Sequence, residues 1–347
     1  MTECEFVDLM STPRVEGVKK LFIFLIVMTA TTVSAHHSEA AYDADSVAAF
    51  QGTVTEFSWR NPHAYIKVET TNADGTQTEW LVETGATPLL VRSGWTPESL
   101  VPGDRVSVRG SPARDGRPNA LLLSMEKADG SVLAQSIAYA VATGSTSDLS
   151  GVWKGSRTTF ESFAEQLLNR RLTEKAAEAQ AQFDLYSENP AAACVAEPTP
   201  TIVALTGVFL TEIELGEDVI MMRNERFDVE RTVYMDGRGH PQSTERTVQG
   251  HSVGSWEGGG TLVVDTTHFA DHKNPTMDGV PSGAQKHVVE RYTLNDDGTG
   301  LTVGIFMEDP EYMVEAFNVT FDWTYRPDLR LLRFDCDLEV ARRYTRQ

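Results

Sequence analysis

Two adjacent histidines, His36 and His37, directly follow an apolar run that ends in small residues. If His36 begins the mature chain, its free amine and its own imidazole can form a chelate ring, and nitrogen ligands of this kind suit Cu(II). His63, in the word NPHA, is the candidate third ligand, and Asp43 and Glu39 are candidates to orient an imidazole. The sequence therefore suggests a copper site on His36, His37 and His63. In the alternative, His63 caps a turn.

A second group of histidines and carboxylates lies in the C-terminal half. The pattern places His251 and Trp256 on one predicted strand, with Asp265 and His268 near the end of its hairpin partner. Side chains on paired strands can face each other at about 5 Å, and acid–base catalysis needs a histidine held by a carboxylate. His251, Asp265 and His268 are thus candidate catalytic residues, and the alternative is a buried hydrogen-bonding set. The whole group comprises His240, His251, His268, His272, His287, Asp265, Asp271 and Glu290.

Two Glu-Arg words, Glu230-Arg231 and Glu290-Arg291, fall on predicted strands. Strand alternation directs one residue of each word inward and the other outward. An inward arginine could hold a ligand carboxylate through two hydrogen bonds, so Arg231 and Arg291, together with Trp256, are candidate ligand-binding residues. The alternative is cross-strand ion pairs on the outer face.

The first 35 residues are predicted to be a leader and secretory signal peptide. Lys19 and Lys20 precede the apolar segment 21–28, and Ala35 ends a small-x-small triplet that predicts cleavage after it. The preceding acidic segment is unlike a signal, which suggests a translation start near Val18. The apolar segment is too short to span a membrane comfortably. We therefore expect a periplasmic or secreted protein with no transmembrane segment after signal removal.

The net charge limits the classes of partner, and the cysteine count predicts one disulfide. The formal net charge of −20 disfavours nucleic acid and anionic membranes, both of which attract basic surfaces. Cys4 lies in the leader, which leaves Cys194 and Cys336 as an even pair in an oxidising compartment. A disulfide between these two cysteines is the expectation.

Residues 36–133 read as a small domain of the OB type. Five runs of alternating residues occur between 50 and 128, with a hairpin signal at Asp74-Gly75 and a short helix predicted after the third run. This order is typical of a small Greek-key barrel.

A linker is predicted at 134–147, followed by a second domain at 148–347. Its first part predicts a helical segment in two pieces, with Thr173 as an N-cap. From Thr201 onward, eight to ten strands separated by short turns predict an antiparallel barrel or sandwich. The last of these predicted strands is LLRFDCDLE. The fold expected is mainly β: a small OB-like barrel, then a lipocalin-like antiparallel barrel with an inserted helical segment.

Several words in the chain resemble known families. AHHSEAAYD, FSWRNPHAYIKV and RSGWTPESLVPGDRVSVRG resemble a family of small exported bacterial proteins of unknown function, which implies export and a small β fold. DLSGVW, CVAEPTPTIV, RTVYMDGRGHP and GHSVGSWEGGGTLVVDTTHF resemble a second uncharacterised exported family. Gly151-x-Trp153 is similar to the lipocalin entry motif, in which an arginine from the last strand covers the tryptophan; Arg330 or Arg333 could do so here.

Three functions remain open. The first is an exported binding protein with a small apolar ligand in the C-terminal barrel and copper on the N-terminal histidines. The second is a lipocalin-like enzyme of the hydratase or isomerase type that uses the His/Asp cluster. The third is a non-catalytic envelope module that binds other proteins.

Overall fold

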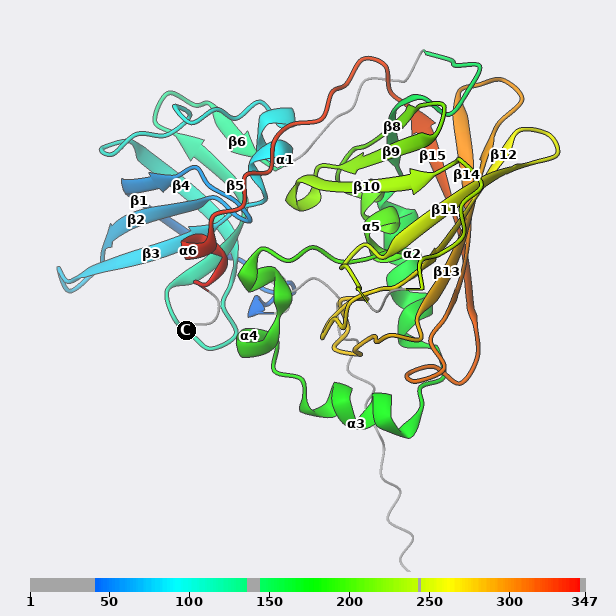
Figure 1. Ribbon diagram of the computed structural model, residues 1–347. Coiled ribbons are helices and arrows are strands. Elements are labelled where there is room, and N and C mark those ends of the chain that lie inside the picture. The colour runs from blue at the N-terminus through cyan, green and yellow to red at the C-terminus, as the bar shows by residue number, and fades with distance from the viewer. Residues whose placement is uncertain (1–40, 136–143, 243–244, 344–347) are drawn as a thin grey trace, which may run out of the picture. The chain divides into compact units, whose positions relative to one another are not determined.

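The computed structural model describes residues 41–135, 144–242 and 245–343, and it is built from two closed β-barrels (Figure 1). This confirms the predicted fold class. Within the described residues, no helix is both long and apolar enough to cross a membrane.

The N-terminal barrel has the strand order of an OB fold. Its strands run β3-β2-β1-β4-β5, and a parallel pairing of β3 with β5, at Leu81 opposite Asn119, closes the barrel. A short strand, β6, extends the sheet beside β5 and was not expected from the sequence. The strands are β1 (Ala48–Ser58), β2 (Tyr65–Thr71), β3 (Gln77–Glu83), β4 (Arg105–Pro112), β5 (Asn119–Lys127) and β6 (Val132–Ala134).

Local sequence accounts for these elements. Gly75 takes a φ of +85° in the turn between β2 and β3, a backbone conformation that glycine adopts without strain. Helix α1 (Thr87–Arg92) follows β3, as predicted, with Pro88 in its first turn. Trp95, 1% exposed, then packs into the core and donates its indole N–H to the carbonyl of Ala134.

The C-terminal barrel is larger. Nine strands run in the order β10-β11-β12-β13-β14-β15-β7-β8-β9, and β9 pairs with β10 to close the ring. All neighbouring strands are antiparallel except β10 and β11, whose short parallel pairing departs from the predicted wholly antiparallel barrel. The strands are β7 (Gly151–Gly155), β8 (Thr211–Leu215), β9 (Val219–Asn224), β10 (Val229–Tyr234), β11 (His251–Glu257), β12 (Thr261–Thr267), β13 (His287–Leu294), β14 (Gly300–Glu308) and β15 (Phe317–Tyr325).

Strict alternation separates the inside of this barrel from its outside. On β15, Phe317, Val319, Phe321 and Trp323 are buried, whereas the residues between them are exposed. The same period of two places one face of each strand in the core. Alternation therefore decides which candidate side chains can meet.

Within the inserted helical segment, α2 and α5 lie on the inner side of the barrel strands (Figure 1). Phe163 on α2 packs edge-on against Phe317 and Phe321 of β15, at centroid distances of 6.0 and 5.5 Å. Thr173 caps α3 by accepting a hydrogen bond from the amide of Ala176, as predicted. The helices of this region are α2 (Arg157–Leu168), α3 (Glu174–Gln182), α4 (Leu185–Glu188), η2 (Pro190–Ala193), α5 (Thr201–Ala204), η3 (Leu205–Gly207) and η4 (Arg226–Asp228).

Trp153 occupies the position expected from the lipocalin entry motif. It lies on β7, is fully buried, and donates its indole N–H to the carbonyl of Leu149. The expected arginine cover is wrong, because Arg330 and Arg333 follow the end of the last strand, and Arg333 is 78% exposed beside Asp335. The Trp153 ring instead packs on Tyr325, at 5.2 Å between centroids.

The predicted last strand around LLRFDCDLE does not form. Side chains take its backbone donors: Asp228 accepts the amides of Phe334 and Asp335, and Glu225 accepts the amide of Leu332. A short helix, α6 (Leu338–Ala341), follows. The predicted disulfide between Cys194 and Cys336 is confirmed, with the two Cα atoms 5.9 Å apart.

Candidate functional site

In the N-terminal barrel, His63 is held by its neighbours on the next strand. It directly precedes β2, and its Nδ1 lies 3.0 Å from the carbonyl oxygen of Thr84 and 3.2 Å from Oε1 of Glu83. The Thr84 carbonyl accepts from Nδ1, so in the neutral imidazole Nε2 is the nitrogen with the lone pair. Metal-binding histidines are commonly oriented by a hydrogen bond from their other ring nitrogen in this way.

Glu83 ties His63 to the beginning of the described chain. Its carboxylate is buried and accepts a hydrogen bond of 2.9 Å from the hydroxyl of Tyr42 through Oε2. Burial, reinforced by the Glu83 carboxylate, raises the pKa of Tyr42 well above its ordinary value, so the hydroxyl stays a donor. Tyr42, Glu83 and His63 thus form a connected set of side chains.

The orienting carboxylate is therefore different from the one predicted. Asp43 contacts Ser46 at 2.5 Å and Arg114 at 3.6 Å, and Glu83 takes the role that the sequence suggested for Asp43. The signal for Glu83 was available: a carboxylate ends the apolar strand run WLVE, at the position opposite Tyr65. Glu39 and the predicted copper ligands His36 and His37 lie outside the described residues.

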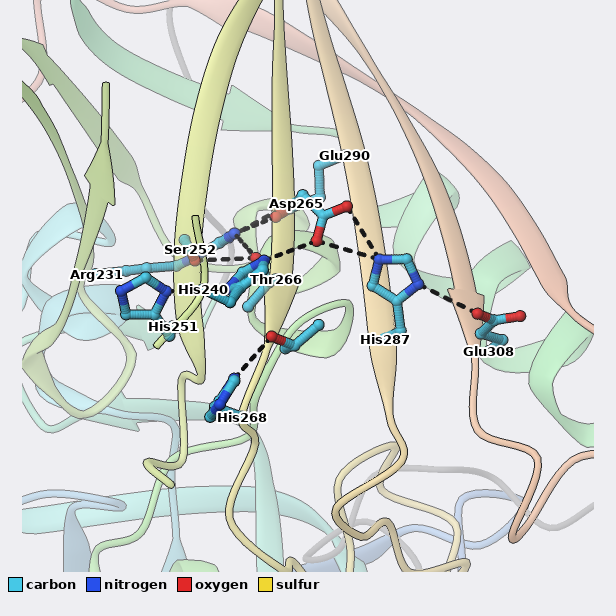
Figure 2. A network of polar contacts seen from close by, with 11 residues as sticks. Arg231, His240, His251, Ser252, Asp265, Thr266, His268, His287, Glu290 and Glu308 are labelled. Carbon is cyan, nitrogen blue, oxygen red and sulfur yellow. Dashed lines mark hydrogen bonds and ion pairs between the residues drawn. The ribbon is translucent and has the colours of Figure 1, made fainter. Parts of the chain in front are cut away.

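In the C-terminal barrel, the predicted histidine cluster forms, and it lies on the outer face of the strands. Register places His251 opposite Thr267 and Asp265 opposite Val289, while His287 pairs with Glu308 on β14. The inward positions on either side of these residues are the ones that the core occupies. Figure 2 shows the outer cluster and the inner network on the two faces of the same strands.

One hydrogen-bonded chain connects the outer cluster. His240 Nδ1 lies 3.0 Å from His251 Nδ1, and His240 Nε2 lies 3.0 Å from Asp265. Asp265 also contacts His287 Nε2 at 3.1 Å, and His287 Nδ1 lies 3.2 Å from Glu308 (Figure 2). Sequence reasoning included Asp265 among the candidates but missed Glu308, which the register of β14 brings to His287.

The cluster holds imidazoles in two different electrostatic states. Burial would lower the pKa of His287, but its hydrogen bonds to Asp265 and Glu308 outweigh burial and raise the pKa above its ordinary value. Burial, followed by the neighbouring His240 and His268, lowers the pKa of His251. The chain can therefore hold a proton at the carboxylate end and keep a neutral imidazole at the other.

His268 and His272 separate in the structure. His268 lies beside the cluster, with its ring centroid 5.9 Å from that of His240 and its Nδ1 2.8 Å from the Thr267 hydroxyl. His272 is only 5% exposed and accepts the amide of Asn274 at 3.2 Å, and burial lowers its pKa to about 4. Asp271 is 72% exposed and pairs with Arg246.

The inner face of the same strands carries a buried ion pair. Arg231 is 5% exposed, and its guanidinium meets both carboxylate oxygens of Glu290, which is 0% exposed. All five guanidinium N–H groups have partners, and the Tyr292 hydroxyl donates to Glu290 at 2.7 Å. The further partners of Arg231 are the hydroxyls of Ser252, Thr199 and Thr266, at 3.0, 3.2 and 2.8 Å.

The three predicted ligand-binding residues are not brought together. Arg231 is inside the barrel and already holds a carboxylate of its own chain, whereas Arg291 points outward, is 49% exposed, and lies 3.6 Å from Glu257. Trp256 is 50% exposed. Large core side chains occupy the interior, so the inward arginine serves the fold. These core side chains include Trp153, Phe163, Tyr292 and Phe321, none more than 2% exposed.

Ion pairs on the outer face, which were the alternative expectation for the two Glu-Arg words, also form. Glu230 faces outward and contacts Arg223 at 3.3 Å, and Arg291 faces Glu257. Each word therefore places one residue in the buried pair and one in an exposed ion pair, as strand alternation requires.

A comparison with known families matches part of the chain. Residues 25–122 match the family of unknown function DUF6152. This stretch is less than half of the 347 residues, and it contains Tyr42, His63 and Glu83, together with His36 and His37. Among curated proteins, none matches the chain.

The region around His63 and the outer cluster of the C-terminal barrel offer different numbers of candidate metal ligands. Within the three described ranges, no group of three or more His, Cys, Asp or Glu side chains is arranged to hold an ion. The DUF6152 region contributes one oriented imidazole, His63, and the outer cluster of the C-terminal barrel contributes two close ring nitrogens.

Proposed function

We propose that this protein is an exported copper-binding protein, in which a processed amino terminus at His36 and the imidazole of His63 chelate Cu(II). The observation that carries the proposal is the pair of contacts that holds the His63 ring in place. Its Nδ1 bonds to the Thr84 carbonyl and lies 3.2 Å from the Glu83 carboxylate, which orients the ring as the outer partners of a metal-binding imidazole do.

The path of the chain supports the same site. Tyr42 is bonded to Glu83, which contacts His63, so the described chain begins beside the candidate third ligand. Four residues lie between His37 and Tyr42, so five Cα-to-Cα steps join them, and an extended chain covers about 3.3–3.6 Å per step. That reach, about 17 Å, lets both histidines arrive at His63.

Export is part of the proposal, because it supplies the free amine. Signal-peptide cleavage after Ala35 bares His36, and an oxidising compartment agrees with the bond between Cys194 and Cys336. We retain the resemblance of the C-terminal half to a second exported family as a prediction. The apolar-ligand role for the C-terminal barrel is not part of the proposal, because core side chains fill its interior.

Copper titration of the exported, correctly processed chain tests the proposal. N-terminal sequencing should give His36 first, and electron paramagnetic resonance should show a Cu(II) signal of a nitrogen-ligand environment that requires His63. We expect His63→Gln to weaken copper binding by about tenfold or more, and Glu83→Gln to weaken it less, because Glu83 only orients the ligand. A chain with one extra alanine before His36 should lose the chelate.

The matched control is His287→Gln, which removes an imidazole from the other barrel. It should leave this copper affinity unchanged. A mature chain that starts well beyond residue 37, or equal affinities in the wild type and His63→Gln, would overturn the proposal.

A further inference from the structure

Three imidazoles, those of His240, His251 and His268, gather on the outer face of the C-terminal barrel, and we call them the histidine trio. Their ring centroids lie 5.2 Å apart for His240 and His251, 5.9 Å for His240 and His268, and 6.3 Å for His251 and His268. The trio lies outside the copper site proposed above and shares no residue with it.

Two nitrogens of the trio already keep the separation of ligands on one ion. His240 Nδ1 and His251 Nδ1 are 3.0 Å apart. Metal–nitrogen bonds of about 2.0–2.1 Å at angles between 90° and 109° place two ligand nitrogens about 2.9–3.4 Å apart. A proton bridges this pair in the metal-free protein, and an ion can replace that proton without moving either ring far.

The other nitrogen of His240 is held as a metal ligand requires. Its Nε2 donates to Asp265 at 3.0 Å, so Nδ1 of a neutral His240 carries the lone pair. Asp265 is fixed in turn by His287. The carboxylate–imidazole arrangement therefore fixes both the tautomer and the direction of His240.

A stacking contact holds the His251 ring, whereas for His268 it is the backbone that is unusual. His251 stacks on Tyr234, with centroids 5.1 Å apart and planes at 23°. His268 takes a φ of +58°, a conformation that non-glycine residues adopt rarely and at a cost of about 1–3 kcal/mol. This backbone sets the direction in which the His268 side chain leaves the strand end, and its ring centroid lies 5.9 Å from that of His240.

We propose that His240 and His251 chelate a divalent late transition-metal ion on the outer face of the C-terminal barrel, with His268 as the third ligand. Neutral imidazoles without thiolates suit zinc or copper. The third ligand must turn, because no three donor side chains in the described ranges are yet arranged about one point. Water completes the coordination shell.

The charges around the trio allow a cation. The Asp265 carboxylate, 40% exposed, faces it from β12, and Glu308 lies one imidazole further along the chain of hydrogen bonds. Arg238 is a positive charge that acts on His251; it lies over Tyr234 and is paired with Asp236. That ion pair reduces the repulsion that Arg238 exerts on a bound ion.

Zinc titration by calorimetry tests the trio. The background is the exported chain with His36→Gln, His37→Gln and His63→Gln, which removes the copper ligands proposed above. We expect one zinc per chain in this background, and an affinity lower by about tenfold or more in His240→Gln and in His251→Gln. The matched control is Glu308→Gln, which lies in the same network but outside the trio and should retain the site.

Footprinting of the unaltered protein avoids dependence on variants that could fail to fold. Zinc should protect His240 and His251 from diethyl pyrocarbonate, as read by mass spectrometry of peptides, and should leave His287 as reactive as before. Equal modification of all three with and without zinc would overturn the proposal.

The two sites fail separately. If the background chain binds no zinc, while the wild type binds one Cu(II) that is lost in His63→Gln, the trio proposal fails and the N-terminal copper proposal stands. If the background chain binds one zinc, while His63→Gln leaves copper binding unaffected, the N-terminal copper proposal fails and the trio proposal stands.

Discussion

Arg231 and Glu290 meet inside the C-terminal barrel, from strands β10 and β13 that are not neighbours in the sheet. Both side chains are buried, and the guanidinium places N–H groups on both carboxylate oxygens. The pair joins β10 to β13 across the inner face of β11 and β12, where Arg231 also donates to Ser252 and Thr266. Both Glu-Arg words of the sequence contribute to this contact.

Glu290→Ala should therefore be strongly destabilising. It leaves a buried guanidinium without its carboxylate, and breaking a buried pair in this way costs about 3–5 kcal/mol. Urea unfolding measures the loss. The matched control is Glu257→Ala, which breaks the exposed contact with Arg291 and should cost no more than about 1 kcal/mol. Equal losses in the two variants would contradict a structural role for the inner pair.

The sequence predicts the outer histidine cluster, but it does not predict the contact between Arg231 and Glu290. Alternation and the short turn between β11 and β12 place His251, Asp265 and His268 near one another, because both features are local. Arg231 and Glu290 meet only through the register and closure of nine strands, which no local pattern encodes.

The same reasoning applies to the predicted strands. The five strands that close the N-terminal barrel could be predicted one by one, because their turns and alternation are local signals, whereas the short strand β6 could not. The last predicted strand of the chain failed, because carboxylates from Glu225 and Asp228 compete for its backbone donors. Long-range side-chain contacts of that kind leave no mark in a strand pattern.

A buried lysine predicts a pH dependence of stability. Lys286 is 1% exposed, its Nζ has no hydrogen-bond partner in the described part of the chain, and burial lowers its pKa to about 7. The unfolded chain keeps its proton up to the ordinary lysine pKa of about 10.4. Between these values the unfolded state binds more protons, so this residue makes the free energy of unfolding rise with pH.

Lys286→Met tests that dependence. The substitution removes a buried amine that lies 4.5 Å from the centre of the Phe269 ring, and it should raise the free energy of unfolding at pH 7 by about 1–3 kcal/mol. Because the wild type gains stability between pH 7 and 9, the gap should narrow at pH 9. Denaturant unfolding of both proteins at pH 7 and pH 9 measures the difference in their free energies of unfolding. A difference that widens with pH would refute the lowered pKa of Lys286.

His287 predicts the opposite pH trend. Its pKa is raised in the fold by Asp265 and Glu308, so its contribution to stability is fully present below the unfolded pKa of about 6.5 and is lost as the pH rises through the folded value. His287→Gln should therefore destabilise the protein more at pH 5.5 than at pH 8.5. Thermal unfolding of both proteins at the two pH values measures this, and equal losses would show that His287 gains no proton on folding.

The disulfide fixes a segment that has no strand of its own. Cys336 lies in the chain that was predicted to be the last strand, and its bond to Cys194 closes a loop with a sequence separation of 142 residues. The adjacent Phe334 is fully buried against Phe227, with ring centroids 4.9 Å apart. In the chain-entropy model, a loop of this length contributes about 5 kcal/mol by restricting the unfolded state.

Cys194→Ser with Cys336→Ser should lower the free energy of unfolding by up to this amount, as urea denaturation of the oxidised wild type and the variant would measure. If the Phe334 contact alone holds the segment, reduction should leave the near-ultraviolet circular dichroism of the folded protein unchanged while the unfolding midpoint falls. A midpoint that does not move would show that the bond contributes nothing to stability.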